Sequence, residues 1–414
     1  MMKKLFLYGM LCGWLLPASS ATFNVNTLID GVDGNPGDGV CEITPATGDC
    51  SLRAAFNEIN VLGGNHIINL GTGIHQITLT GEEDAGLSGD LDLFGAEVQI
   101  SGQGSASTVI DGNDLHRVFH VFNEGNFSLT GVTVTGGRAD TAAHNIGGGL
   151  LIAGGSTSAM FQDVVILDNA ANAGGGMFVS GANVIMTDSL VQGNAAESLG
   201  FTNPFGPGIF VNSGIITIRN STFTENNVGT KAIRVEGGEI YMTNSTVSGN
   251  DGGGLRTANA SGSVRASTFY STIGANVSHF SFDDTHVLFI GSSVLTTGSD
   301  QPQFNCQAGD KPTSLGHNVV NDDSCSFMAT GDQENTEANL LGLANNGGAW
   351  PTHALSLGSP AIDAVPLASC VDAMGASLGE DQRGFIRPSG VTCDAGAYEM
   401  DADVLFANGF DGVL

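Results

Sequence analysis

The sequence predicts an all-β solenoid, in which short parallel strands stack coil upon coil, and three observations point to it. Gly accounts for 61 of the 414 residues, while 41% of the chain is hydrophobic and only 13% is charged. This composition is typical of many short strands joined by tight turns. One segment recurs along the chain, and a second, Gly-rich segment keeps step with it. Self-similarity at a period of about 20 to 50 residues indicates a repeat fold.

The recurring segment reads apolar-x-apolar-x-(Asp/Asn)-Ser-Thr-apolar-x-x-Asn, with Leu in place of Thr in its first clear copy. Clear copies end at Asn194, Asn226 and Asn250, and weaker copies centre on Gly131, Asp163, Ala266 and Gly291. The Gly-rich element opens a short strand ahead of its partner segment. Each period is therefore expected to hold three short strands separated by Gly or Asn corners.

Alternation within each predicted strand sends one side chain inward and the next outward. Ile240 and Met242 are expected to point in, and Tyr241 and Thr243 out. Because one coil cannot bury its inner face alone, the coils must stack and place equivalent residues in ladders. Asn suits a corner, since it tolerates left-handed backbone and its amide can bond to neighbouring coils. The expected ladders are Asn169, Asn194, Asn226 and Asn250 at one corner, and Ser189, Ser221, Ser245 and Ser267 beside the next.

Residues 1–21 resemble a secretory signal peptide. Lys3 and Lys4 precede an apolar run over residues 5–16, and small residues follow up to Ala21. We therefore expect export, and no later stretch is apolar enough to span a membrane.

Six cysteines follow the leader, and fifteen pairings are open to them. Export favours disulfides over metal thiolates. Proximity in the sequence favours one arrangement: Cys41 with Cys50, Cys306 with Cys325, and Cys370 with Cys393.

The chain is strongly acidic, with 42 Asp and Glu against 13 Lys and Arg and a net charge of -29. Too little positive charge is present to neutralise phosphates, so a nucleic-acid partner is not expected. An anionic membrane surface is disfavoured for the same reason.

Three segments resemble known bacterial families. The repeats resemble right-handed parallel β-helix proteins of the polymorphic outer-membrane-protein type, whose F-x-x-N motif is matched by residues 223–226. Residues 50–55 (CSLRAA) resemble the C-S-L-R-E-A motif that opens many exported β-helix proteins, with Ala54 in place of Glu. Residues 345–399 resemble the choice-of-anchor module of surface proteins, through the strings NNGG, SPAID, DQRG and CDAGAYE. The resemblances imply a right-handed parallel β-helix in an envelope or extracellular protein, and no defined chemistry.

Unpaired strand edges at both ends of such a helix invite aggregation and need covering. A short amphipathic helix over residues 51–60, tied by Cys41–Cys50, is expected to cap one end, and the Cys-containing residues after 300 the other. The expected organisation is a signal peptide (1–21), an N-terminal cap (22–64), β-helix repeats (65–300), a C-terminal cap or anchor-like module (301–399) and a tail (400–414).

An acid-rich loop, residues 30–39, offers the weak candidates for a cation site. Asp30, Asp33, Asn35 and Asp38 carry oxygen atoms that could hold calcium. The alternative is a solvated turn, because Asp, Asn and Gly favour turns without any ion. No other metal or cofactor is expected.

One outward ladder combines aromatic and basic side chains. It runs through Leu151, Phe178, Phe210, Arg234 and Arg256. Aromatic residues beside Arg are typical of binding hot spots, so Phe178, Phe210, Arg234 and Arg256 are the expected ligand-binding residues. The alternatives are that the insertion at residues 197–206 covers the rings and that the arginines only offset an acidic surface.

These observations favour an exported surface or secreted protein that binds a glycan or a protein partner without catalysis. A polysaccharide lyase or glycoside hydrolase is the alternative, because Arg234 or Arg256 could act as a base beside a calcium site. A structural protein of the cell envelope is the third possible function. The polar tail, residues 400–414, is too short to span a membrane, so we expect no integral anchor.

Overall fold

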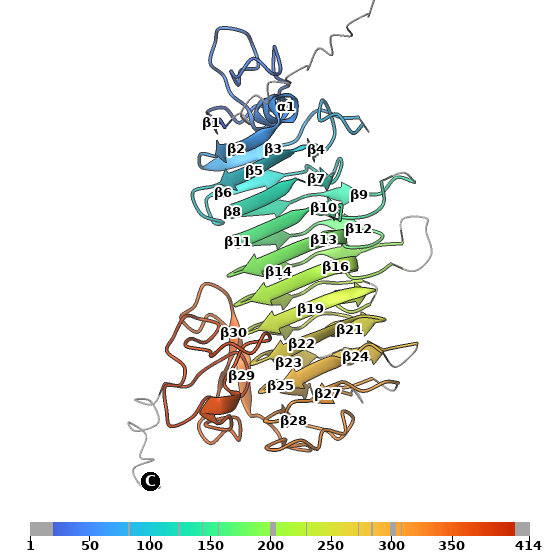
Figure 1. Ribbon diagram of the computed structural model, residues 1–414, viewed down its shortest axis with the longest axis vertical. Helices are drawn as coiled ribbons and strands as arrows, with labels where there is room; N and C mark the ends of the chain where they lie inside the picture. Colours follow the sequence, from blue (N-terminus) through green and yellow to red (C-terminus); the bar gives the residue numbers. More distant parts are fainter. Residues whose placement is uncertain are drawn as a thin grey trace, which may run out of the picture.

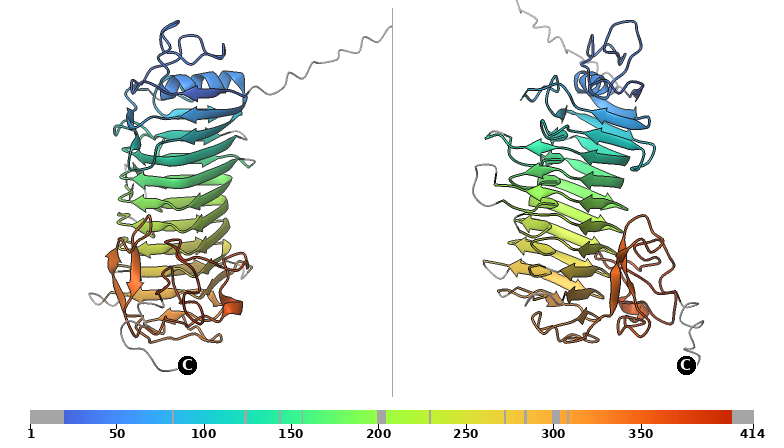
Figure 2. Two further views of the ribbon diagram at one scale, coloured as in Figure 1. Left: turned by 90° about the vertical axis from the view of Figure 1, so that its left-hand side faces the viewer. Right: turned by 180° about the vertical axis from the view of Figure 1, so that it is seen from behind.

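The computed structural model describes residues 20–401, except 82, 123–124, 143, 156, 199–203, 229, 272, 283–284, 299–303 and 308. Most of the predicted leader (1–21) and tail (400–414) therefore lies outside the described residues. The chain forms an elongated parallel β-helix, whose coils stack as rungs along the long axis (Figures 1 and 2). This confirms the predicted solenoid.

The coils build three faces of parallel strands, here called faces A, B and C. Face A contains β1 (Thr22–Asn24), β2 (Gly64–Asn69), β5 (Ala96–Ser101), β19 (Gly238–Thr243), β22 (Ser261–Arg265), β25 (Leu288–Gly291) and β27 (Thr313–Ser314). Face B contains β3 (Gly73–Gln76), β6 (Thr108–Asp111), β14 (Leu190–Gln192), β17 (Thr222–Thr224), β20 (Thr246–Ser248), β23 (Thr268–Ser271), β26 (Val294–Thr297) and β28 (Val319–Val320). Face C contains β4 (Leu91–Phe94), β7 (Phe119–Phe122), β10 (Leu150–Ala153), β18 (Ile233–Glu236), β21 (Leu255–Ala258) and β24 (Val277–Phe280).

Four long strands turn a corner and belong to two faces each. They are β8 (Asn126–Thr135) and β11 (Ser158–Leu167), which link faces A and B, and β13 (Met177–Thr187) and β16 (Ile209–Arg219), which link faces C and A. Three two-residue strands, β9 (Arg138–Ala139), β12 (Ala170–Ala171) and β15 (Ala195–Ala196), form a small parallel sheet beside them.

Strand alternation fills the interior as expected. Ile240 and Met242 are fully buried, and aromatic rings such as Phe127 and Phe161 pack edge to face along the same core. Tyr241 faces outward and is partly exposed. Thr243 also lies on the outer face, but it is buried because the C-terminal segment covers it and the Ala373 N–H donates to its Oγ1 (2.9 Å).

The predicted Asn ladder is present and buried. The Nδ2 of each Asn donates to the Oδ1 of the next, over 3.0, 3.0 and 2.9 Å along Asn169, Asn194, Asn226 and Asn250. Each Oδ1 also accepts the backbone N–H of the preceding ladder residue. The ladder therefore satisfies polar groups that would otherwise be buried without partners.

The backbone explanation offered for this ladder was wrong. None of the four Asn residues has a positive φ; the residue before each one does. These are Asp168, Gly193, Glu225 and Gly249, with φ of 53°, 67°, 56° and 64°. Asn is used here for its amide, and its neighbour absorbs the left-handed turn.

A second left-handed corner lies at the (Asp/Asn) position of the repeat. Asp188, Asn220 and Asn244 have φ between 48° and 50°, a conformation that Asn and Asp adopt more readily than other side chains. The Ser that follows belongs to the predicted Ser ladder, in which each Oγ accepts the backbone N–H of the Ser one coil earlier. The recurrence of Asp/Asn-Ser therefore reflects one turn geometry repeated coil after coil.

The N-terminal cap is the helix α1 (Leu52–Leu62), seen end-on above the first strands in Figure 1 and lengthwise across them in the left view of Figure 2. Ser51 caps it by accepting the Ala54 N–H, and Cys41–Cys50 ties the preceding loop. Arg53 is fully buried and forms an ion pair with Asp30 (2.6 Å). The helix is thus buried under its own loop as well as against the core.

The C-terminal disulfides pair as predicted, Cys306–Cys325 and Cys370–Cys393. Coil stacking extends past the expected boundary at residue 300, because β27 and β28 still pair in parallel. It also begins before residue 65, with β1 and β2.

Only the first part of the C-terminal segment covers the C-terminal end of the β-helix, where the expectation was that all of residues 301–399 would do so. The remainder, residues 338–401 with the hairpin β29 (Leu340–Ala344) and β30 (Thr352–Leu355), packs against the side of the lower coils (Figures 1 and 2). Thr222 and Thr246 of face B bond to Pro351 and Gln382, and the Ala397 N–H donates to Thr268. We refer to residues 338–401 as the side module.

The inward assignment predicts losses of stability of very different size for two adjacent residues of β13. Met186 is fully buried and Ile185 is 40% exposed. Met186→Asp should lower the free energy of unfolding by at least about 4 kcal/mol, because it buries a charge between coils. Ile185→Asp should cost about 1 kcal/mol. Urea denaturation of both variants tests this, and equal losses would contradict the assignment.

Candidate functional site

The predicted ladder lies on face C in the expected register. Leu151 pairs with Phe178, Phe178 with Phe210, Phe210 with Arg234, and Arg234 with Arg256. The same ladder continues toward the N-terminal end through His120 and Asp92.

The aromatic part of this ladder is covered. Phe178 is only 9% exposed and Phe210 only 5%, and they pack with Leu151 and Phe205 in a small satellite core. Phe205, from the end of the insertion at residues 197–206, lies 6.3 Å from the Phe210 ring. These outward rings are therefore mostly buried, because Phe205 packs against them, which agrees with the alternative that the insertion covers them.

The basic part of the ladder is mostly engaged as well. Arg234 stacks on the Phe205 ring, with its Cζ 3.9 Å from the centroid, and forms an ion pair with Glu236. Lys231 is buried beside it and donates to the Ala275 carbonyl. Arg256 differs, because its Nε is buried without a hydrogen-bond partner among the described residues. Burial and the nearby Arg256 lower the pKa of Lys231 to about 8.

The calcium candidates are engaged in local bonds. Asp30 pairs with Arg53 and accepts the N–H groups of residues 78 and 79. Asp33 accepts two backbone N–H groups, and Asn35 donates to Asp38. Among the described residues, these three carboxylates do not converge into a metal-binding group. Calcium binding at this loop stays a prediction.

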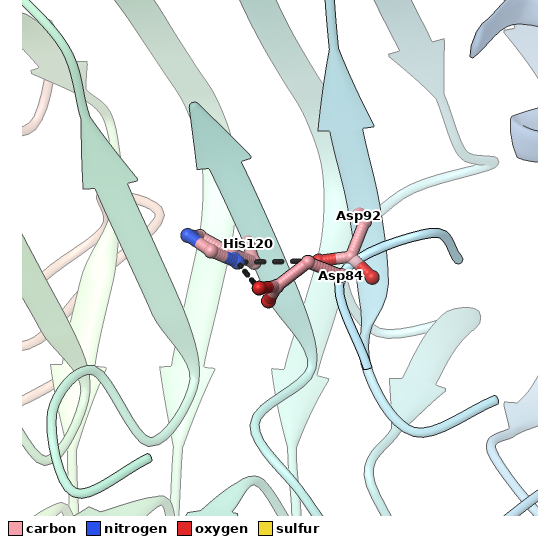
Figure 3. Close-up of side chains that lie close together, drawn as sticks. All are labelled: Asp84, Asp92 and His120. Carbon is pink, nitrogen blue, oxygen red and sulfur yellow. Dashed lines mark hydrogen bonds and ion pairs between the residues drawn. The ribbon is translucent and has the colours of Figure 1, made fainter. Parts of the chain in front are cut away.

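A convergent group of titratable side chains lies elsewhere on face C (Figure 3). Asp92 of β4 and His120 of β7 are direct register partners, and Asp84 reaches them from the loop before β4. His120 Nδ1 lies 3.2 Å from Asp92 Oδ1 and 3.7 Å from Asp84 Oδ1. The Asp92 side chain is fully buried, whereas that of Asp84 is 63% exposed.

Burial dominates the electrostatics of this group. It raises the pKa of Asp92 to about 7, with further contributions from the negative charges of Asp84 and Glu83. Burial also lowers the pKa of His120 to about 4, helped by the positive charge of Arg117. The imidazole is consequently neutral near neutral pH.

A groove separates face A from the side module. It has a volume of about 500 Å³, and its lining includes Tyr241, Ser263, Arg265, Phe289, Asp372 and Ala373. Tyr241 and Phe289 lie in one outward ladder with Ser263 between them. The two rings are therefore about 10 Å apart along the stack, at about 4.8 Å per coil.

Arg265 is the unusual residue of this groove. Its guanidinium lies over the backbone of Gly291, where an added Cβ would come within 2.6 Å of Nη1. Burial lowers its pKa, and no carboxylate of the described residues offsets that effect. By contrast, Asp372 on the opposite wall pairs with Arg219 (2.7 Å).

Sequence reasoning missed both of these features. Asp92 and His120 belong to the ladder that was identified, but they are 28 residues apart and only strand register joins them. Arg265 could have been found, since it lies on the outer face of β22, the strand that follows the β21 strand of Arg256. The groove around Arg265 could not have been predicted, because its opposite wall comes from a segment more than 100 residues later in the chain.

Comparison with known proteins identifies the fold. A family model described as a right-handed β-helix region matches residues 96–271. Among solved structures, the crystal structure of pectate lyase Pel9A is similar over 93% of this chain and 97% of that chain, with a TM-score of 0.50 and 14% sequence identity. A search of the curated proteins finds no match. The protein is a right-handed parallel β-helix, and at this identity the structural likeness concerns the fold alone.

The buried Lys231 leads to a prediction about pH. Its pKa of about 8 lies below the ordinary 10.5, so the unfolded state binds more protons between these values and stability rises with pH there. Lys231→Met should therefore stabilise the protein at pH 7 by up to about 3 kcal/mol, and most of this gain should be lost as the pH rises from 8 to about 10.5.

Chemical denaturation of the variant and the wild type at pH 7, 9 and 10.5 tests this prediction. The exposed Lys311 provides a matched control, and Lys311→Met should show no such pH-dependent gain. A gain for Lys231→Met that is constant with pH would show that the charge of Lys231 is not responsible.

Proposed function

We propose that this protein is an exported binding protein that holds an acidic glycan in the groove between face A and the side module, without cleaving it. The single observation that supports this function most is Arg265, a half-buried guanidinium that has no carboxylate partner among the described residues and lines a groove of ligand size. In a chain of net charge -29, a cation that the described carboxylates leave unpaired in a groove favours an anionic ligand.

The remaining lining suits a sugar chain. Tyr241 and Phe289 provide two partly exposed rings along one ladder, and such rings offer flat apolar contact area. Ser261 and Ser263 add hydroxyl groups that can donate and accept hydrogen bonds. A polymer lying along the stack would contact both rings and place a carboxylate at Arg265, where charge-assisted hydrogen bonds are strong.

Binding is favoured over cleavage by the state of the groove's carboxylate. Burial alone would raise the pKa of Asp372, but its bonds from the backbone N–H groups of Ala376 and Met374 and its pair with Arg219 lower it below the ordinary value. A residue held in this way is a poor general acid. The lyase and hydrolase alternatives, and a structural envelope role, are separated from binding by the experiment below.

Several observations support export and a surface or secreted location. The leader-like residues 1–21 and three disulfides suit an oxidising compartment. In the described part of the chain, no helix has the length and apolar character needed to cross a membrane. Export and a surface location are also what three resemblances imply: those to outer-membrane-type repeats, to the CSLREA motif and to the anchor module.

The binding proposal predicts a specific loss. Arg265→Gln should weaken binding of polygalacturonate at least about ten-fold, because a charge-assisted bond contributes about 1.5 to 3 kcal/mol. Arg256→Gln is the matched control on face C and should leave the affinity unchanged. Neutral dextran should not bind to any of the three proteins.

Isothermal titration gives the affinities, and ultraviolet absorbance of unsaturated products, with and without calcium, reports lyase activity. Loss of binding in Arg256→Gln alone would move the site to the face C ladder. Accumulating unsaturated product would replace binding by a lyase function, and an absence of any glycan binding by the wild type would overturn the proposal.

The export proposal makes its own prediction. The full chain expressed in a Gram-negative host should lose residues 1–21, and the mature protein should begin at Thr22 and contain no free thiol. N-terminal sequencing and thiol titration of the fractionated protein measure both. Retention in the cytoplasm with an intact leader would contradict export.

A further inference from the structure

We propose that Asp84, Asp92 and His120 form a binding site for a divalent first-row transition metal, with Zn²⁺ as the representative ion. This site is on face C near the N-terminal cap, whereas the glycan groove lies on face A beside the side module (Figures 1 and 3). The inference does not depend on the proposed function.

The first argument is geometric. One ligand atom from each of the three side chains lies within 4.8 Å of the other two. In a tetrahedral zinc site with bonds of about 2.0 to 2.1 Å, neighbouring ligand atoms are about 3.3 Å apart. The distances from His120 Nδ1 to Asp92 Oδ1 and Asp84 Oδ1, 3.2 and 3.7 Å, bracket this value. Small side-chain adjustments would therefore complete three coordination positions.

The second argument concerns hydrogen bonding. His120 Nδ1 can present one proton or one lone pair, yet two carboxylates face it. A single N–H satisfies Asp92 and leaves Asp84 at 3.7 Å, beyond hydrogen-bond distance. Two carboxylate oxygens and a neutral imidazole nitrogen around one point form a ligand set that a cation satisfies in full.

The third argument is the unbalanced charge of a buried carboxylate. The Asp92 side chain is fully buried, and a buried anion normally has a cationic partner. Arg117 is close enough to affect the pKa of Asp92, but its guanidinium is already paired with Asp90. A bound divalent cation would neutralise the charges of Asp92 and Asp84 together.

The ligands are held in place by their surroundings. The Gly86 N–H donates to Asp92 Oδ2 (3.0 Å), and the Gly86 carbonyl accepts bonds from Asn57 and Arg53 of the capping helix. The His120 ring stacks on Phe122 with centroids 4.4 Å apart. Such supporting contacts orient metal ligands before binding. The exposed Asp84 leaves the site open to solvent for entry of the ion.

The donor set also indicates the class of ion. Imidazole nitrogen suits zinc, copper, nickel and iron, while calcium and magnesium prefer oxygen ligands in larger numbers. A set of one nitrogen and two carboxylates with an open position therefore favours Zn²⁺ over Ca²⁺.

The experiment is a titration of the metal-free, full mature protein with ZnCl₂, measured by isothermal titration in the absence of any glycan. The wild type should bind one equivalent. Asp84→Asn should lower the affinity at least about ten-fold, because it removes a ligand at an exposed position where the fold tolerates change. Glu97→Gln removes the same charge from face A and should bind as the wild type does.

Co²⁺ substitution provides a second readout that does not depend on affinity. Visible absorption bands of four-coordinate Co²⁺ should appear in the wild type and be absent in His120→Gln. No zinc binding by the wild type, or equal binding by Asp84→Asn and the wild type, would overturn the site. Stronger binding of Ca²⁺ than of Zn²⁺ would overturn the class of ion. Glycan affinity is also measured with and without zinc. Because the metal site and the groove are separate, the outcome for zinc binding and the outcome for glycan binding can then be judged independently.

Discussion

The structure depends on one constraint, which is that every coil must hydrogen-bond to the next in a fixed register. A slip of one residue would turn every inward side chain outward, so the register is strongly determined wherever the interior is apolar. The Asn ladder from Asn169 to Asn250 and the Ser ladder beside it add side-chain bonds that are satisfied only in this register. Left-handed residues such as Asp188 and Asn220 turn the chain at the same point of successive coils.

Fixed register converts positions in the sequence into ladders on the surface, and these ladders are where chemistry can arise. On face C, one ladder runs from Asp92 and His120 through buried aromatic residues to Arg234 and Arg256. Neighbours in a ladder are only about 4.8 Å apart, so side chains that are remote in sequence can share a proton, a charge or an ion. The loops decide which of them remain accessible, as Phe205 shows by covering Phe210.

The side module creates the second site by a different route. Its bonds to Thr222, Thr246 and Thr268 hold it against face B, and its Asp372 and Ala373 reach the edge of face A. The side module therefore forms a wall beside face A, so Arg265 lines a groove instead of an open surface. The same contacts explain why Thr243 is buried although strand alternation places it outside.

Periodicity in the sequence was sufficient to predict the solenoid, the inward residues and both polar ladders, because these depend on regularly repeated spacing. The capping helix was predicted from its amphipathic pattern, and the disulfide pairs from proximity in the sequence, since both are local features. The sequence did not determine which outward residues stay exposed. Phe178 and Phe210 were expected at a binding surface, yet they are buried and Phe205 packs against them. Asp84, Asp92 and His120 meet, and Arg265 faces Asp372, only because the coils stack and the chain folds back on its own side. These contacts join residues with no periodic relation, so only the tertiary structure could decide them.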